Sequence, residues 1–143
     1  IYAVEKNPQT FKVAERNFNR HEVEIKGFVG DLLEPIKKNN IKGDILISNP
    51  PYISLKDYEN LDIWVKNEPY EALTGGLDGL DFYRRIADSY KAVLKEEGYL
   101  AVEIGWDQFL AVKNIFEEKG LSFFARRVDD GGRDRVIVMK YRK

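Results

Sequence analysis

The sequence predicts an α/β protein built on a mostly parallel sheet with helices on both faces. Short apolar runs typical of buried strands alternate along the chain with longer stretches in which apolar residues recur at helical spacing. A helix that connects two strands of one sheet places those strands parallel to each other. The last two apolar runs follow each other with only a turn between them, so one antiparallel strand is expected.

The first part of the chain contains three expected strands separated by two expected helices. Asn7 and Pro8 are typical of a helix cap and a first helical turn, and an apolar stripe follows them. Gly30 closes the second strand, and the second helix stops near Gly43. The expected strands cover residues 1–5, 23–29 and 44–48, and the expected helices cover residues 7–20 and 32–40.

Residues 53–77 interrupt the alternation, because they are rich in polar and aromatic residues and show no clear period. A connection this long in a compact domain is usually functional. Near the end of the chain, residues 129–132 are a hairpin-like turn signal. Between and around these segments, helices are expected over residues 78–95 and 106–119, and strands over residues 99–104, 121–127 and 135–141.

Composition narrows the classes of function. The 143 residues have the size of one domain, with a formal net charge of −1 and a pI of about 6.0. Proteins bind nucleic acid largely through Lys and Arg on phosphates, so this balance argues against a DNA partner. The chain has no cysteine and one histidine, His21, so no metal site is expected, and a reducing cytoplasm fits. No apolar stretch approaches the roughly 20 residues that span a bilayer.

The tetrapeptide Asn49-Pro50-Pro51-Tyr52 follows the apolar strand expected over residues 44–48. Prolines have no N–H group and a fixed φ angle, so their carbonyl groups point in fixed directions with few local competitors. The Asn49 side-chain oxygen and a proline carbonyl can each accept one N–H, and the Tyr52 ring can pack on a flat group. This set of groups is suited to holding a planar –NH2 group. A proline-rich turn after a strand is the structural alternative.

Two acidic residues, Glu5 and Asp31, come at the ends of the first two expected strands. Ligands of doubly wound folds bind at the carboxyl ends of the strands, where an acid typically bonds a ribose hydroxyl about 20 residues after a glycine-rich loop. Counting back from Glu5 runs off the start of the chain, so that loop is not among these residues. Asp31 is placed to accept an adenine amino hydrogen. Each acid could instead be a solvated loop residue.

Four separated blocks of the sequence resemble one family closely. Besides Asn-Pro-Pro-Tyr, these blocks are Glu68-Pro69-Tyr70-Glu71-Ala72-Leu73 with residues 75–84, Glu103-Ile104-Gly105 with Gln108, and residues 132–136. The chain resembles the catalytic domain of the release-factor glutamine N5-methyltransferases, the HemK/PrmC family, over nearly all of its residues. The resemblance implies a Rossmann-like class I fold, S-adenosylmethionine (AdoMet) as methyl donor, and the glutamine of the release-factor Gly-Gly-Gln motif as methyl acceptor.

The resemblance also implies a role for each residue of the motifs. By motif position, Glu5 binds the ribose of AdoMet, and Asp31 with the Leu32 backbone holds the adenine. Asn49 and Pro50 accept the amide hydrogens of the glutamine. Asn49 is also one of the implied cofactor-binding residues. Tyr52 packs against that amide, so the implied catalytic residues are Asn49, Pro50 and Tyr52, and the implied substrate-binding residues are Asn49, Pro50, Pro51 and Tyr52.

The family pattern has a glycine-rich strand and a small N-terminal domain ahead of the blocks found here. We therefore expect residues 1–143 to be a partial catalytic domain that lacks the first strand and helix. Strands 1–5 and 44–48 would then lose a shared neighbour and expose apolar edges, an aggregation liability. We expect this chain alone to be poorly stable or inactive, whereas the complete enzyme would be a cytoplasmic monomer. A monomer that melts cooperatively would contradict this expectation.

Several alternatives stay open at the level of sequence. Adenine-N6 DNA methyltransferases and guanine-N2 RNA methyltransferases use related motifs, although a flipped base needs a basic channel that the pI disfavours. A remnant that only binds partners is another alternative. Residues 68–79 are expected to shape the glutamine pocket or a lid, with Gly75 and Gly76 allowing close backbone approach, or to be a structural loop. Glu103 ends a strand near the site or caps a helix.

Overall fold

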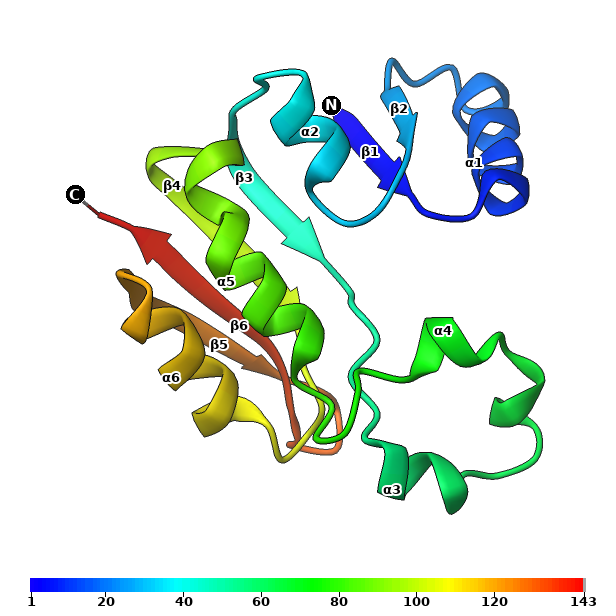
Figure 1. Ribbon diagram of the computed structural model, residues 1–143, viewed down its shortest axis with the longest axis vertical. Helices are drawn as coiled ribbons and strands as arrows, with labels where there is room; N and C mark the ends of the chain where they lie inside the picture. The colour runs from blue at the N-terminus through cyan, green and yellow to red at the C-terminus, as the bar shows by residue number, and fades with distance from the viewer. Residues whose placement is uncertain (143) are drawn as a thin grey trace. The chain divides into compact units, whose positions relative to one another are not determined.

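The computed structural model describes residues 1–142 and divides the chain into two compact units. The first unit comprises residues 1–42, and the second begins at Gly43. Figure 1 shows the helices and strands of both units, coloured along the chain. Each unit has its own sheet.

The first unit contains a parallel two-stranded sheet, formed by β1 (Tyr2–Glu5) and β2 (Lys26–Val29), and two helices, α1 (Pro8–Arg20) and α2 (Glu34–Lys38). The Asn7 side chain caps α1 by accepting the N–H groups of Gln9 and Thr10, as expected. The second strand is shorter than predicted. Val23 donates its N–H to the Phe18 carbonyl at the end of α1, so it is not available to a strand.

The second unit is built on a four-stranded sheet in the order β3-β4-β6-β5. Its strands are β3 (Gly43–Ser48), β4 (Leu94–Glu103), β5 (Leu121–Val128) and β6 (Asp134–Tyr141). β3 and β4 are parallel, whereas β6 runs antiparallel to both β4 and β5. The prediction of one antiparallel strand in a mostly parallel sheet is therefore confirmed.

Two long helices, α5 (Asp81–Val93) and α6 (Phe109–Glu118), lie side by side on one face of this sheet (Figure 1). Fully buried side chains from both helices and from the central strands form the core, and the rings of Tyr83 and Phe116 meet edge to face at 6.4 Å. Within this unit α5 and α6 both lie on the same face of the sheet (Figure 1). Ile45 and Ile47, which point to the other face, are 62% and 76% exposed.

The boundary between α5 and β4 differs from the sequence prediction. Helix α5 ends at Val93, because Leu94 already has extended backbone angles and pairs with Gly43 as the first residue of β4. The prediction started this strand at residue 99. Glu97 has a φ of 64°, and the pairing shifts register between Gly43 and Ile45. This irregular segment interrupts the alternating pattern of the strand, so the sequence pattern did not predict the first residues of β4.

Residues 53–77 form three short helical segments rather than a featureless loop. These are α3 (Leu55–Glu59), the 3₁₀ helix η1 (Val65–Asn67) and α4 (Tyr70–Leu73). The rings of Tyr58 and Tyr70 pack edge to face at 5.0 Å. A parallel β-bridge between Ile53 and Thr74 joins the two ends of this segment. No helix in the described part of the chain combines the length and the apolar character needed to cross a membrane.

Candidate functional site

The Asn49–Tyr52 segment leaves the sheet at the carboxyl end of β3. Asn49 is exposed, Pro50 is buried, and Tyr52 is half-buried. Within residues 1–142, neither the Asn49 side-chain amide nor the Pro50 carbonyl has a hydrogen-bond partner. Two acceptor groups directly after β3 therefore have no partner among the described residues, and their use by a ligand stays a prediction.

Tyr52 is held at both of its ends. Its hydroxyl group donates to Glu103 Oε1 at 3.1 Å, and its carbonyl oxygen accepts from Gln108 Nε2 at 2.9 Å. Burial, followed by the negative charge of Glu103, raises the pKa of the Tyr52 hydroxyl above its ordinary value, although Arg135 opposes the shift. Tyr52 therefore keeps its proton at neutral pH and presents a fixed ring.

The structure gives Glu103 a role that the sequence left open. Glu103 is the last residue of β4, and its side chain bonds the Tyr52 hydroxyl across 51 residues of sequence. It is not the cap of α6, because Gln108 occupies the N-cap position of that helix. Periodicity cannot reveal a contact between two separate strand ends, so only the Glu-Ile-Gly block pointed to this residue.

The loop at residues 75–81 packs directly against the Asn49–Tyr52 segment. Gly75 donates its N–H to the Ile53 carbonyl, and a side chain at Gly75 would come within 2.6 Å of the Pro51 carbonyl oxygen. The expectation that Gly75 permits close backbone approach is therefore confirmed. Gly76 and Gly79 have φ angles of 88° and 77°, which other residues rarely adopt, and a Cβ at Gly79 would clash with the Tyr52 carbonyl.

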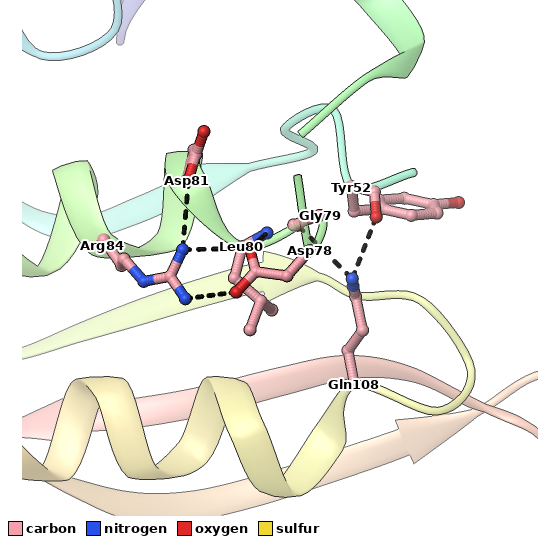
Figure 2. A network of polar contacts seen from close by, with 7 residues as sticks. All are labelled: Tyr52, Asp78, Gly79, Leu80, Asp81, Arg84 and Gln108. Atoms are coloured by element: carbon pink, nitrogen blue, oxygen red, sulfur yellow. Dashed lines mark hydrogen bonds and ion pairs between the residues drawn. The ribbon is translucent and has the colours of Figure 1, made fainter. Parts of the chain in front are cut away.

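A polar network fixes the end of this loop at the start of α5 (Figure 2). The Arg84 guanidinium donates to the carboxylates of Asp78 and Asp81 at 3.0 and 3.1 Å, and Asp78 Oδ1 also accepts the Leu80 N–H at 3.1 Å. The hydrogen bond from Arg84 holds the pKa of Asp78 below its usual value. Both partners are largely exposed, so the network orients the loop more than it stabilises the fold.

Glu5 and Asp31 follow neighbouring parallel strands of the first unit. Glu5 pairs in register with Val29, and the Gly30 N–H donates to the Glu5 carbonyl at 3.0 Å, so the two acids share one edge of the sheet. Glu5 Oε1 accepts the Asn7 N–H at 2.7 Å, which fixes the carboxylate at the start of α1. Leu32 has a φ of 52°. Asn49 belongs to the second unit.

Tyr83 gives this part of the molecule a measurable dependence on pH. It is fully buried and donates to the Glu103 carbonyl at 2.8 Å, and burial, with smaller effects from Tyr52 and Glu103, raises the pKa of its hydroxyl group. The folded state then holds this proton more tightly than the unfolded state does. The stabilisation is complete below the unfolded pKa of about 10 and is lost progressively as the pH rises above it.

We therefore expect the free energy of unfolding of the full-length protein to fall more steeply above about pH 10 than that of a Tyr83→Phe variant. At neutral pH the variant should be less stable by about 1 kcal/mol, because the Glu103 carbonyl loses its buried donor. Urea unfolding followed by circular dichroism from pH 8 to pH 11 measures both effects. Parallel curves for the two proteins would contradict the assignment.

Comparison with known proteins identifies similar sequences over nearly the whole chain. The chain is 38% identical over 140 residues to the release factor glutamine methyltransferase of Bacillus subtilis and 39% identical over 140 residues to that of Aquifex aeolicus. Each match covers 96% of this chain but only 48% and 49% of those proteins. The chain therefore spans about half the length of the curated relatives it matches. No protein-family model matches it.

Solved structures support the fold independently. A methyltransferase from Pyrococcus furiosus superposes with a TM-score of 0.73 over 99% of this chain and 62% of that one, at 17% identity. Fibrillarin from Aeropyrum pernix, solved with natively bound S-adenosyl-L-methionine, gives 0.64 over 97% and 54%, at 14% identity. The release-factor-specific protein-(glutamine-N5) methyltransferase of Alicyclobacillus acidocaldarius gives 0.55 over 99% and 79%, at 22% identity. The fold is thus that of the class I methyltransferases, as predicted.

Proposed function

By sequence the chain belongs to the release factor glutamine methyltransferase family, and on that premise we propose that the protein methylates the N5 nitrogen of the glutamine in the Gly-Gly-Gln motif of peptide-chain release factors. One observation carries the proposal. At the carboxyl end of β3, the Asn49 amide oxygen and the Pro50 carbonyl have no partner within residues 1–142, while Tyr52 beside them is fixed through Glu103 and Gln108.

The two free acceptors explain how a poor nucleophile could react. The lone pair of an amide nitrogen is delocalised into the carbonyl, so the –NH2 group must be oriented and its developing positive charge stabilised. One N–H of the glutamine would donate to Asn49 Oδ1 and the other to the Pro50 carbonyl. These groups would aim the nitrogen at the methyl group and stabilise the charge during transfer. The nitrogen would give up one N–H proton to water as it gains the methyl group, and because the methyl donor is already activated, no strong base is required from the protein.

The residues at the edge of the first unit fit the adenosyl part of AdoMet chemically. The Glu5 carboxylate, which uses one oxygen for the Asn7 N–H, has the acceptor capacity to bind ribose hydroxyls. Asp31 would accept the adenine amino hydrogen, and the Leu32 backbone would contact the ring. AdoMet supplies an already activated methyl group when bound.

The partner in this proposal is a protein, so the remaining surface is expected to recognise polypeptide. The flat side of the glutamine amide would pack on the Tyr52 ring and on Pro51, and residues 68–79 would line the approach to it. Neither DNA binding nor membrane association is part of the proposal. Release factors act in the cytoplasm, which is where we place the protein, as a monomer.

Methyl transfer from labelled AdoMet tests the proposal directly. The full-length protein would be incubated with a release factor, with the Gly-Gly-Ala variant of the same factor, and with duplex DNA. We expect label on the unaltered factor alone. Label on the Gly-Gly-Ala variant, label on DNA, or no label at all would each overturn the proposed substrate.

A further inference from the structure

We propose that Gln108 is a positioning residue of the methyl-transfer site, which fixes the Tyr52 backbone and thereby the direction of the acceptors on Asn49 and Pro50. This inference rests on the proposed function. Gln108 lies between β4 and α6 and touches neither the free Asn49 amide nor the Pro50 carbonyl. It would therefore act through the Asn49–Tyr52 segment and not on the substrate itself.

The Gln108 side chain joins three segments that are far apart in sequence (Figure 2). Its Nε2 group donates to the Tyr52 carbonyl at 2.9 Å and, more weakly, to the Gly79 carbonyl at 3.4 Å. Its Oε1 atom accepts the Gly105 N–H at 2.9 Å. Each amide hydrogen and the oxygen thus have a partner, so the orientation of the side chain is determined by its surroundings.

This arrangement is more than a helix cap. Gln108 occupies the N-cap position of α6, yet its side chain makes no capping hydrogen bond to that helix. A residue that only served the helix would use its side chain on the free N–H groups of the first turn. Gln108 instead directs its amide to the Asn49–Tyr52 segment and to the loop at residues 75–81.

The prolines transmit this constraint to the acceptors. Rings fix the φ angles of Pro50 and Pro51, so the peptide planes between Asn49 and Tyr52 have few free rotations. Holding the Tyr52 carbonyl removes much of the remaining freedom at the end of the segment. A shift of about 1 Å in reacting groups can cost a factor of about 10² in rate, so small displacements of the Pro50 carbonyl would matter.

Two glycines, Gly79 and Gly105, pack closely against the Gln108 side chain. A Cβ at Gly105 would come within 2.9 Å of Gln108 Oε1, and a Cβ at Gly79 would come within 2.7 Å of Gln108 Nε2. Gly79 and Gly105 are also buried. The backbone at Gly79 and at Gly105 therefore approaches the Gln108 amide closely, as expected for a side chain that holds two loops together.

The test is Gln108→Glu in the full-length protein, with a release factor as substrate. Glutamate has the same shape but, as a carboxylate, cannot donate and would repel the carbonyls of Tyr52 and Gly79. We expect kcat to fall by about 10- to 100-fold, with the KM for AdoMet changed less than twofold. Asn114→Asp is the matched control, because it makes the same chemical change at an exposed position of α6. It should behave as wild type.

Two further measurements separate positioning from loss of structure. Gln108→Met keeps the length of the side chain without hydrogen bonds or charge, and it decides the question if the glutamate variant does not fold. Each variant is also made in an Asn49→Ala background. If Gln108 acts through the Asn49–Tyr52 segment, its substitution should lower kcat less than threefold in the Asn49→Ala background. A general structural defect would instead lower kcat by the same factor in both backgrounds.

The two hypotheses fail in different ways. If the wild-type protein labels no release factor, the proposed function is wrong and this inference has no reaction to act on. If the wild type labels the factor, but Gln108→Glu and Gln108→Met both retain kcat within twofold, the inference alone is wrong. A folded Gln108→Glu variant with reduced kcat, near-normal KM for AdoMet and coupling to Asn49 supports it.

Discussion

Replacement of Asn49 by alanine in the full-length protein should lower kcat for release-factor methylation by about 10²–10³-fold. Asn49 is exposed and has no hydrogen-bond partner within residues 1–142, so the substitution removes an acceptor for the substrate without disturbing the fold. The substitution removes stabilisation of the positive charge that develops on the amide nitrogen during transfer. The effect should therefore appear in kcat more than in the KM for AdoMet. Initial rates with labelled AdoMet and saturating release factor measure it.

Two variants sharpen this experiment. Asn49→Asp keeps an acceptor oxygen at the same place, with a second oxygen in place of the NH2 group, and should retain more activity than Asn49→Ala, because accepting the glutamine N–H is the function assigned to this side chain. Asn114→Ala removes an asparagine side chain from an exposed position on α6 and should leave kcat unchanged. A loss under threefold for Asn49→Ala would remove Asn49 from the mechanism.

The sequence predicted the frame of the candidate site well, because local signals determine it. An apolar run gives β3, and the four residues after it determine which groups lie at its carboxyl end. The backbone geometry of the next block requires glycine. At Gly75 the residue type alone therefore indicates the close backbone approach. These features depend on nearest neighbours in the chain, so one sequence suffices to infer them.

Contacts between residues far apart in the sequence could not be predicted from local patterns. Glu103 meets Tyr52 across 51 residues and Gln108 meets Tyr52 across 56, and no periodicity encodes either distance. The early start of β4 was missed for a related reason. Its first residue pairs with Gly43 through long-range bonds that override the local helical pattern of residues 78–95.

The uncovered face of the second unit's sheet illustrates a further limit. The continuous apolar run of β3 predicts two buried faces, since Ile45 and Ile47 are as apolar as Leu46. Within this unit only the face beneath α5 and α6 is covered, and both isoleucines are exposed. Apolarity on both sides of a strand indicates that both faces are suited to burial, but it does not say which segment covers each of them.

Tyr52 offers the second large effect, and its two variants should differ strongly. Tyr52→Ala removes the ring proposed to pack on the glutamine amide and should lower kcat/KM for the release factor by about 10²-fold. Tyr52→Phe keeps the ring and removes only the hydrogen bond to Glu103, so kcat/KM should fall less than about fivefold. The same substitution should lower the free energy of unfolding by about 1 kcal/mol.

The comparison separates two roles for one residue. The raised pKa of the Tyr52 hydroxyl keeps it protonated at neutral pH, so it is a donor to Glu103 and not a base for the amide nitrogen. The pH dependence of kcat below about pH 9 should therefore be the same for wild type and Tyr52→Phe. If Tyr52→Phe loses as much activity as Tyr52→Ala, the hydroxyl group, and not the ring, would be the group that acts on the substrate.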